Sequence, residues 1–322
     1  MSTDLSIITV NYNSGDLLLG CLRAVFEHTA NVEFEYFVVD NASRRDGFLA
    51  KARKEYPQVQ VLENETNVGF AAGCNVALEH ARGRYVLLLN PDTAVGPQAL
   101  PCMIRFMDTR PDIAVLGSPL CYSDGRDQGV AGRGFPTPLA GLFGRTSLLT
   151  KLFPGNRFSA KFSSKRDPDR REPYAVDWVS GACMLIRRAA LTQVGPLDPG
   201  FFFMWEDTDF CKRMRHAGWQ VYCYHEANVM HCEGGSRNRG WHVLWVATVA
   251  FHQGAYRYYR KHINARVLDP THLLVMGALA ARTLLVLATR SLHKIWSACL
   301  TQSKCSAPPP HEDHTLNSSV TR

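Results

Sequence analysis

Two separate parts of the chain carry carboxylates in a setting that suits catalysis or metal binding. The first is Asp92, in the segment Asn90-Pro91-Asp92, which directly follows the apolar stretch Tyr85–Leu89. A carboxylate held by a proline turn at a strand end could ligate Mg²⁺ or Mn²⁺, because these cations prefer oxygen ligands and often share them with substrate phosphates. A simple Asx turn is the alternative, and this segment alone leaves both open.

The second part is the acidic cluster Glu206, Asp207 and Asp209, which follows the largely aromatic run Phe201–Trp205. Carboxylates beside aromatic side chains can have raised pKa values and act as general bases. The alternative is that they occupy the first turn of a helix, where the helix dipole favours negative charge. The cluster by itself does not decide between these two interpretations.

His231 is a third candidate, because it precedes the turn-forming residues Gly234–Ser236. A histidine next to such a turn could reach a metal ion or a diphosphate, although a lone histidine is more often structural. A zinc site is not indicated, since Cys223, His225, His231 and Cys232 do not match the usual ligand spacing.

Two polar segments could bind a nucleotide. Asp40 and Asn41 follow an apolar stretch and could hydrogen-bond a base or ribose, although capping of a helix by Asp40, Asn41 or Ser43 is equally good chemistry. Asn67–Asn75 opens a predicted helix with small residues, which allow a ligand to approach the backbone. Neither segment matches a dinucleotide-binding or ATP-binding glycine motif.

The elements that must position these residues alternate between strand and helix. Short apolar runs rich in β-branched residues predict buried strands, and apolar residues at helical spacing predict helices between them. This order is typical of βαβ units with a largely parallel sheet, whose ligands lie outside the carboxyl ends of the strands. The predicted strands are Leu5–Asn11, Glu35–Asp40, Val59–Leu62 and Tyr85–Leu89, and the predicted helices are Asp16–His28, Arg44–Tyr56 and Ala71–Arg82. The polar clusters Asn11–Asn13, Asp40–Ser43 and Asn90–Asp92 fall at those ends.

The second half has a less regular pattern. Asp124–Arg171 is rich in Gly, Pro and basic residues and predicts long loops. Tyr174–Arg188 predicts two strands joined by a turn. Asp207–Gly218 and Trp241–Lys261 predict helices, the second of them rich in aromatic residues.

Thr271–Ser297 is apolar but contains Arg282, Arg290 and Lys294 on one helical face. Its longest uninterrupted apolar run, Leu273–Ala281, is short for a bilayer span, so we predict an amphipathic helix in the membrane interface. A helix packed on the domain is the alternative. The expected organisation is a catalytic domain over residues 1–265, this helix over 266–300 and a disordered tail over 301–322.

The composition of the chain restricts the kinds of partner it can bind and the cellular compartment it suits. The net charge of +7 suits an anionic partner, namely a nucleotide, a phospholipid surface or a nucleic acid. No nucleic-acid motif is present, which disfavours the last. The 10 cysteines form no C-x-x-C pair, and the N-terminus lacks the pattern of a secretory signal, so we expect a cytoplasmic protein.

Each motif is weak alone, but together they resemble glycosyltransferase family 2, which comprises inverting enzymes with the GT-A fold. Within it, the chain is similar to the rhamnosyltransferase-type branch that acts on bacterial polysaccharides. The resemblance covers roughly residues 5–262 and lies in SIITVNYNS, VVDNASRRDG, NETNVGFAAGCNVAL, YVLLLNPDT, WVSGACMLIRR, FFFMWEDTDFCKRMRHAGW and MHCEGGS. It implies an α/β fold with a Rossmann-like, mostly parallel central sheet, helices on both faces and further C-terminal helices.

The resemblance also implies roles for individual residues. Asp207 matches the catalytic base and Glu206 its neighbour. Asp92 matches the last carboxylate of the D-x-D metal motif, with His231 as a supporting ligand for Mg²⁺ or Mn²⁺, whereas Asn90 departs from the motif and leaves one anionic ligand. The nucleotide-sugar would be lined by Val10, Asn11, Tyr12, Asn13, Asp40, Asn67, Gly69, Asn75 and Asn90. The acceptor site would be shaped by Trp178, Gly181 and Trp205.

The implied activity is inverting transfer of a sugar, with L-rhamnose from dTDP-rhamnose as the favoured donor, to a glycan or lipid-linked glycan at the inner face of the cell membrane. One alternative is a sugar-phosphate nucleotidyltransferase, although Asn11–Asp16 lacks the cation that such enzymes carry after the first strand. The other is a non-catalytic carbohydrate- or membrane-binding module, which only Asn90 favours.

Overall fold

The computed structural model describes residues 3–43, 47–129, 132–137, 172–232, 241–266 and 268–305, without the side chains of residues 242 and 292–305. Most of the predicted loops of Asp124–Arg171, the Gly234–Ser236 turn and the tail beyond residue 305 lie outside the described residues.

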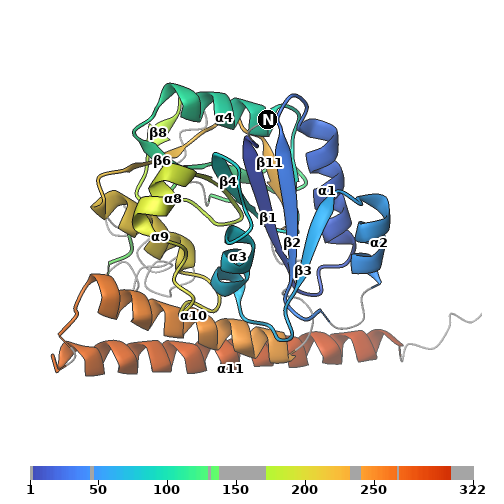
Figure 1. The fold of residues 1–322 in the computed structure, drawn as a ribbon. Coiled ribbons are helices and arrows are strands. Elements are labelled where there is room, and N and C mark those ends of the chain that lie inside the picture. The colour runs from blue at the N-terminus through green and yellow to red at the C-terminus, as the bar shows by residue number, and fades with distance from the viewer. Residues whose placement is uncertain are drawn as a thin grey trace, which may run out of the picture.

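The centre of the molecule is an eight-stranded sheet in the order β3-β2-β1-β4-β9-β6-β10-β8 (Figure 1). The strands β9 and β8 run antiparallel to their neighbours, and the other six share one direction. The strands are β1 (Leu5–Asn11), β2 (Phe34–Asp40), β3 (Val59–Glu63), β4 (Tyr85–Leu89), β6 (Ile113–Gly117), β8 (Tyr174–Ala175), β9 (Cys183–Arg187) and β10 (Gln220–Cys223).

Helices cover both faces of this sheet and create two apolar cores. Alternate residues of one strand serve different cores: Ile7 packs with one set of helices and Ile8 with the other. Strands buried on both faces read as continuous apolar runs, which explains sequences such as YVLLL. The first core contains α1 (Asp16–His28), α2 (Phe48–Glu55) and α4 (Ala99–Thr109), and the second contains α3 (Phe70–Leu78), α8 (Arg188–Val194) and α9 (Glu206–His216).

The predicted elements of the first 90 residues are largely confirmed. β1, α1 and β4 have the predicted bounds, whereas α3 ends at Leu78, four residues before the predicted end. The two strands predicted within Tyr174–Arg188 are present as β8 and β9, but they do not pair with each other. β8 pairs with β10 at the sheet edge, and β9 lies between β4 and β6. Local pattern could not show this, because every partner is distant in sequence.

A second, three-stranded sheet was not predicted. It consists of β5 (Thr93–Val95), β11 (Val229–His231) and β7 (Leu120–Cys121), in that order. In the antiparallel pairing of β11 with β5, His231 is opposite Thr93. Because Thr93 directly follows Asp92 in the chain, this register places His231 close to Asp92.

Two long helices, α10 (Trp241–His262) and α11 (Thr271–Cys305), lie side by side along one edge of the domain (Figure 1). By length and composition, Thr271–Ser291 of α11 is long and apolar enough to cross a membrane, with a mean hydropathy of 1.7, and only 6% of that stretch is buried. The uninterrupted run Leu273–Ala281, on which the sequence prediction depended, is shorter than this apolar part of the helix.

The fully buried carboxylate of Asp209 on α9 contacts the end of helix α10. One of its oxygens lies 2.8 Å from Lys261 Nζ and 2.7 Å from His262 Nε2, and the other accepts a hydrogen bond of 2.9 Å from Arg213 Nε. Burial alone would raise the pKa of Asp209, but the hydrogen bonds from His262, Lys261 and Arg213 outweigh it and lower the pKa below its usual value. The start of α9 and the end of α10 are therefore held together.

We expect Asp209→Ala to lower the free energy of unfolding by about 3 kcal/mol, the lower end of the range for breaking a buried ion pair, because the partly buried Arg213 and Lys261 lose this carboxylate while Lys261 keeps Asp198. A carboxylate with a lowered folded pKa stabilises the fold above its unfolded pKa of about 3.9, and that contribution is lost as the pH falls through the folded value. Urea unfolding should therefore show the full difference at neutral pH and a smaller one in acid. Asp112→Ala, which removes an exposed ion pair with Arg110, is the control and should cost about 1 kcal/mol or less. Equal losses in the two variants would contradict the prediction.

Candidate active site

The ends of β1 and β2 form a hydrogen-bonded polar corner. Asn11 and Asp40 are register partners, and Asn11 Nδ2 donates to Asp40 Oδ1 over 2.7 Å. Asp40 Oδ2 accepts from the Ser43 backbone N–H over 2.9 Å, and Ser43 Oγ accepts from the Asn13 backbone N–H over 2.9 Å. Helix α2 begins only at Phe48 and has no side-chain cap, so Asp40 does not cap it. Asp40 is instead held in one orientation at the sheet edge.

Two further residues predicted to line the nucleotide lie in or beside this corner. Val10 is buried, and a Cβ added to Gly73 of α3 would be 3.0 Å from its Cγ1. Tyr12 follows Asn11 and is exposed, so its ring is available to a ligand at the carboxyl end of β1.

A second set of contacts joins this corner to the start of α3. Asn41 Nδ2 donates to the Gly69 carbonyl over 3.0 Å and lies 3.3 Å from Asn67 Oδ1, which accepts from the Gly69 N–H. Gly69 has a φ of +87°, and a Cβ there would collide with the Phe202 carbonyl oxygen. Only glycine fits this position, where the loop before α3 meets the loop before α9.

Asn75 serves the packing of α3. Its Nδ2 donates to the Leu197 carbonyl over 2.8 Å, and its Oδ1 accepts from the Leu197 N–H over 3.2 Å. Both ends of the amide are used in this link to the loop after α8. The nucleotide contact that the sequence suggested for Asn75 stays a prediction.

Asp92 and His231, which are 139 positions apart, meet at the small sheet. His231 Nε2 lies 3.3 Å from Asp92 Oδ1, and both side chains are nearly buried. On its other side, His231 Nδ1 lies 2.9 Å from Gln128 Oε1, while Gln128 Nε2 donates to the His231 carbonyl over 2.6 Å. Gln128 is buried and was not singled out from the sequence, since no motif marks it.

These contacts determine which nitrogen of His231 carries a proton. An amide oxygen can only accept, so Nδ1 must donate to Gln128 Oε1. In the neutral imidazole, Nε2 then presents a lone pair to the Asp92 carboxylate. Two acceptors that face each other require a proton or a cation between them, and one carboxylate oxygen with one imidazole nitrogen suits Mn²⁺ or Mg²⁺ completed by phosphate and water. No group of three or more His, Cys, Asp or Glu able to hold a metal occurs in the part of the chain that is described.

Asp207 lies in the first turn of α9. Its Oδ2 accepts from the Gly181 N–H over 3.2 Å, and its Oδ1 accepts from the Thr208 N–H over 2.6 Å. Burial of the carboxyl group raises the pKa of Asp207, and these hydrogen bonds offset only part of the rise. A partly exposed carboxylate with a raised pKa at a helix start has the properties of a general base.

Glu206, its neighbour, differs in environment. It is buried, and its Oε2 has no hydrogen-bond partner among the described residues. Burial, followed by the charges of Asp207 and Asp209, raises the pKa of Glu206 well above its usual value. The pKa of Cys74 on α3 is raised by burial and, to a smaller extent, by the charge of Glu206, so this carboxyl group faces the interior. Glu206 therefore keeps its proton to a higher pH than an exposed glutamate does.

The three residues predicted to shape the acceptor site have different surroundings. Gly181 touches Asp207 directly, as described. Trp178 donates from Nε1 to the Gly134 carbonyl over 3.1 Å. Trp205 faces α10, with its ring centroid 5.5 Å from that of Phe251 and 5.4 Å from that of Tyr258. Their contacts with an acceptor stay predictions.

The two carboxylate sites lie at the same edge of the sheet. The Asn90 N–H donates to the Ala182 carbonyl over 3.0 Å, and the adjacent Gly181 N–H donates to Asp207. The turn that contains Asp92 is thus connected to Asp207 through the Gly181–Ala182 backbone, which is hydrogen-bonded to both. The Asn11–Asp40 corner is at the same edge, because β1, β2 and β4 are parallel.

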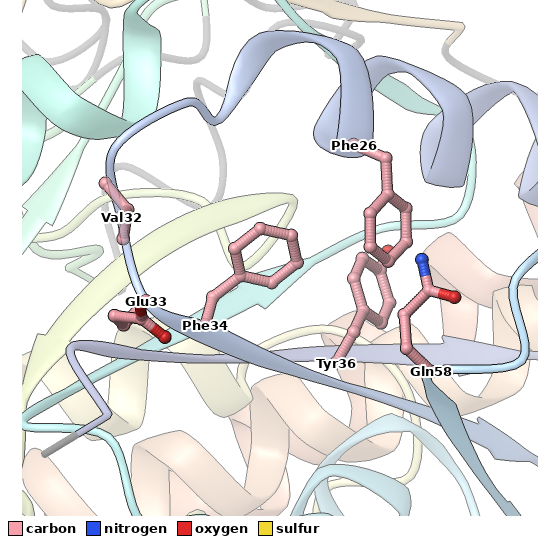
Figure 2. A pocket seen from close by; sticks show the side chains of 6 residues that line it. All are labelled: Phe26, Val32, Glu33, Phe34, Tyr36 and Gln58. Carbon is pink, nitrogen blue, oxygen red and sulfur yellow. The ribbon is translucent and has the colours of Figure 1, made fainter. Parts of the chain in front are cut away.

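A hollow with a mixed aromatic and polar lining lies at the opposite end of the strands (Figure 2). It is lined by residues at the start of β2, the end of α1 and the turn before β3, and Phe26 stacks 5.1 Å from Tyr56 behind it. Because β2 runs from Phe34 to Asp40, the hollow is separated from the carboxylates by the length of the strand. Its lining residues are Phe26, Val32, Glu33, Phe34, Tyr36 and Gln58.

A mostly parallel sheet with acidic side chains gathered at its carboxyl edge is the architecture of the GT-A nucleotide-sugar enzymes. A model of glycosyl transferase family 2 matches residues 6–195, and the chain belongs to this family. The chain is similar to N-acetylglucosaminyl-diphospho-decaprenol L-rhamnosyltransferase of Mycobacterium tuberculosis, at 27% identity over 88% of this chain and 92% of that protein. It is also similar to the low-salt glycan biosynthesis hexosyltransferase Agl10 of Haloferax volcanii, at 26% identity over 67% of this chain and 62% of that protein.

Solved structures confirm the predicted fold class. GalNAc-T7, determined with UDP, GalNAc and Mn²⁺, superposes with a TM-score of 0.56 at 14% identity, over 87% of this chain and 55% of that one. TarS of S. aureus gives 0.52 at 16% identity, over 86% of this chain and 48% of that one. The chain thus spans about half of each structure, and the likeness concerns the fold.

Proposed function

We propose that this protein transfers L-rhamnose from dTDP-rhamnose, with inversion at the anomeric carbon, to a hydroxyl of a lipid-linked glycan in cell-surface polysaccharide synthesis. The observation that carries the proposal is the pair of carboxylate sites, Asp92 with His231 and Asp207, at one edge of the sheet beside the Asn11–Asp40 corner. The name of the mycobacterial relative supports the rhamnosyl donor and the lipid-linked acceptor. Such an acceptor places the enzyme at the inner face of the cell membrane.

In this mechanism, Asp207 accepts the proton of the acceptor hydroxyl while that oxygen attacks C1 of the sugar. The bond from C1 to the diphosphate oxygen breaks as the new glycosidic bond forms, so a single displacement inverts C1. The hydrogen bonds from Gly181 and Thr208 hold the base in place. The raised pKa of the neighbouring Glu206 disfavours a second negative charge beside the base.

Asp92 and His231 would hold a divalent cation, Mg²⁺ or Mn²⁺. Such a cation neutralises negative charge on a departing nucleoside diphosphate. Asn90 supplies no second carboxylate, so the protein offers one anionic ligand where a D-x-D sequence would offer two. Asn11 and Asp40 of the hydrogen-bonded corner, with Asn67 in the adjoining contacts at the start of α3, orient the nucleoside.

The proposal is tested first by binding. We expect dTDP to raise the thermal stability of the purified protein more than UDP or GDP does, and Mn²⁺ to increase the effect, because ligands that bind only the folded state stabilise it by about 2.7 kcal/mol at one hundred times the dissociation constant. Turnover of dTDP-rhamnose to a product of inverted configuration, followed by NMR, completes the test. No stabilisation by any of the three nucleotides, or pyrophosphate release from a sugar phosphate and a nucleoside triphosphate, would refute it.

Gln128→Leu tests the role of the buried glutamine. This change removes the acceptor that orients His231, and loss of such an outer contact typically lowers metal affinity about 10–100-fold. We expect Mn²⁺ binding, measured by electron paramagnetic resonance, to weaken by that factor while dTDP binding without metal is retained. Gln193→Leu, at a glutamine that accepts from Trp219 Nε1 on the surface, is the matched control. Unchanged Mn²⁺ affinity in Gln128→Leu would exclude the role.

A further inference from the structure

The side of α11 that faces away from the domain is an unbroken apolar stripe. At 3.6 residues per turn its eight members fall within an arc of about 140° over more than four turns of the helix. Leu273, Leu274 and Leu284 are 70%, 74% and 68% exposed. The stripe consists of Leu273, Leu274, Gly277, Ala278, Ala281, Leu284, Leu285 and Ala288. An exposed apolar surface of this extent marks a site of association.

The opposite side of α11 is occupied by α10. Tyr256 OH lies 3.2 Å from His272 Nδ1, and Tyr259 OH lies 2.9 Å from Thr271 Oγ1. Further along, the guanidinium of Arg282 lies over the ring of Phe251, at 5.6 Å from its centroid. These contacts run in antiparallel register, so α11 follows α10 along its length. The stripe is therefore the free face of a helix whose other face is already packed.

The charge of this region is mostly positive. Residues 241–305 contain eight Lys or Arg and a single acidic residue, Asp269, which gives +7. Two of the cations, Arg257 and Lys261, are paired with Asp198 and Asp209 of the catalytic domain. At the start of α10, Trp241 and Trp245 are exposed at a spacing of four residues. Tryptophan and cationic side chains around an apolar face are typical of helices at the surface of anionic membranes.

We propose that α11 lies flat on an anionic lipid bilayer, with the stripe in the acyl boundary and α10 between it and the catalytic domain. A crossing by Thr271–Ser291 would place Arg282 near the middle of the bilayer and would separate α11 from α10. A second copy of the chain on the stripe would bring two positively charged segments together, so charge favours the lipid. The proposal rests on the proposed function for its lipid-linked acceptor.

This arrangement also fixes the height of the active site above the membrane. Asp209 joins α9 to the end of α10 through Lys261 and His262, and Asp207 is two residues before it. The base is thus held at a constant distance from the surface in which a lipid-linked acceptor is anchored.

Flotation of the full chain with vesicles tests the surface. We expect binding to phosphatidylcholine vesicles that contain phosphatidylglycerol, weaker binding to phosphatidylcholine alone, and release by alkaline carbonate. The double variant Leu274→Glu with Leu285→Glu should reduce the partition coefficient at least about tenfold, since two apolar contacts are lost and negative charge is added. Gln58→Glu with Gln60→Glu adds the same charge at exposed positions around β3 and should bind like the wild type. Arg290→Glu, at an exposed cation, should reduce only the preference for anionic vesicles.

Three results would overturn the proposal. Resistance to carbonate would show that α11 spans the bilayer. Wild-type binding by the double-glutamate variant would show that the stripe is not the contact. A dimer in solution that the double-glutamate variant converts to a monomer would show that a second copy covers it. Turnover with a soluble acceptor should be equal in all these variants. Vesicle binding without turnover would refute only the proposed function. Turnover without vesicle binding would refute only the proposed membrane surface.

Discussion

Asp207→Asn is expected to reduce kcat by about 10²–10⁴-fold, the contribution of a positioned general base, while dTDP binds with unchanged affinity. The amide keeps the size of the side chain, and its single oxygen can accept from the Gly181 N–H or from the Thr208 N–H but not from both. Unchanged dTDP affinity would show that the fold is intact and that the loss reflects the missing base. Steady-state kinetics with dTDP-rhamnose, together with dTDP titration by calorimetry, separates the two effects. Activity within a fewfold of the wild type would remove Asp207 from the mechanism.

Glu206→Gln is the matched control, one residue away on the same helix. Because burial raises the pKa of Glu206 and so favours its neutral form, an amide of the same shape should retain most of the activity. Because the folded pKa of Glu206 is raised, ionising this carboxyl group costs more in the folded protein than in the unfolded chain. The wild type therefore loses stability as the pH rises above the unfolded pKa of about 4.3. Glu206→Gln cannot ionise, so it should become more stable relative to the wild type as the pH rises. A loss as large as that of Asp207→Asn would show that Glu206 takes part in proton transfer.

The pH dependence of kcat/KM is an independent test of Asp207 as the base. Asp207 acts only when deprotonated, and burial raises its pKa above the usual 3.8. The acid limb of kcat/KM should therefore lie above pH 3.8 and be absent from the residual activity of Asp207→Asn. An identical acid limb in the variant would assign it to another group.

Asp92→Ala is expected to reduce kcat by about 10²–10³-fold, in the range seen when one group that stabilises the transition state is removed. Mn²⁺ should then no longer increase the thermal stabilisation by dTDP, because His231 alone remains as a protein ligand. Binding of dTDP without metal should persist, since the Asn11–Asp40 corner is intact. Turnover and its Mn²⁺ dependence that match the wild type would contradict a metal at Asp92.

The reverse change, Asn90→Asp, restores a second carboxylate and serves as the counterpart. The Asn90 carbonyl and N–H form the turn that precedes β5, through Thr93 and Ala182, and this backbone role does not depend on the side chain. We therefore expect Mn²⁺ to bind more tightly to this variant with the fold unchanged. Weaker Mn²⁺ binding would place the site elsewhere.

The central strands could be predicted because their burial leaves a local signature. β1 and β4 are covered on both faces, so their sequences are continuous apolar runs that end where polar residues begin. The polar residues at those ends, Asn11, Asp40 and Asp92, had to share one edge once the strands were parallel. The order of the sheet beyond β4 left no such mark, because the antiparallel β9 inserts between two strands from which it is distant in sequence.

Neighbouring residues show most clearly what tertiary structure adds. Glu206 and Asp207 have the same chemistry and adjacent positions, but one faces the interior beside α3 and the other accepts from Gly181 at the sheet edge. A helix rotates successive side chains by about 100°, so their environments differ although their sequence context does not. The sequence could identify the pair, and only packing could give the two carboxyl groups different surroundings.

The amino-acid sequence alone determined the βαβ organisation of the first 90 residues, the carboxylates at Asp92 and Asp207, and the apolar, basic character of the C-terminal helix. Those properties depend on residue type and spacing along one element. Only the tertiary structure decided that His231 reaches Asp92, that Gln128 orients it, and that the apolar stripe of α11 faces outward while its other side packs on α10. These are contacts between segments far apart in the chain, and the long-range packing that creates them has no counterpart in local pattern.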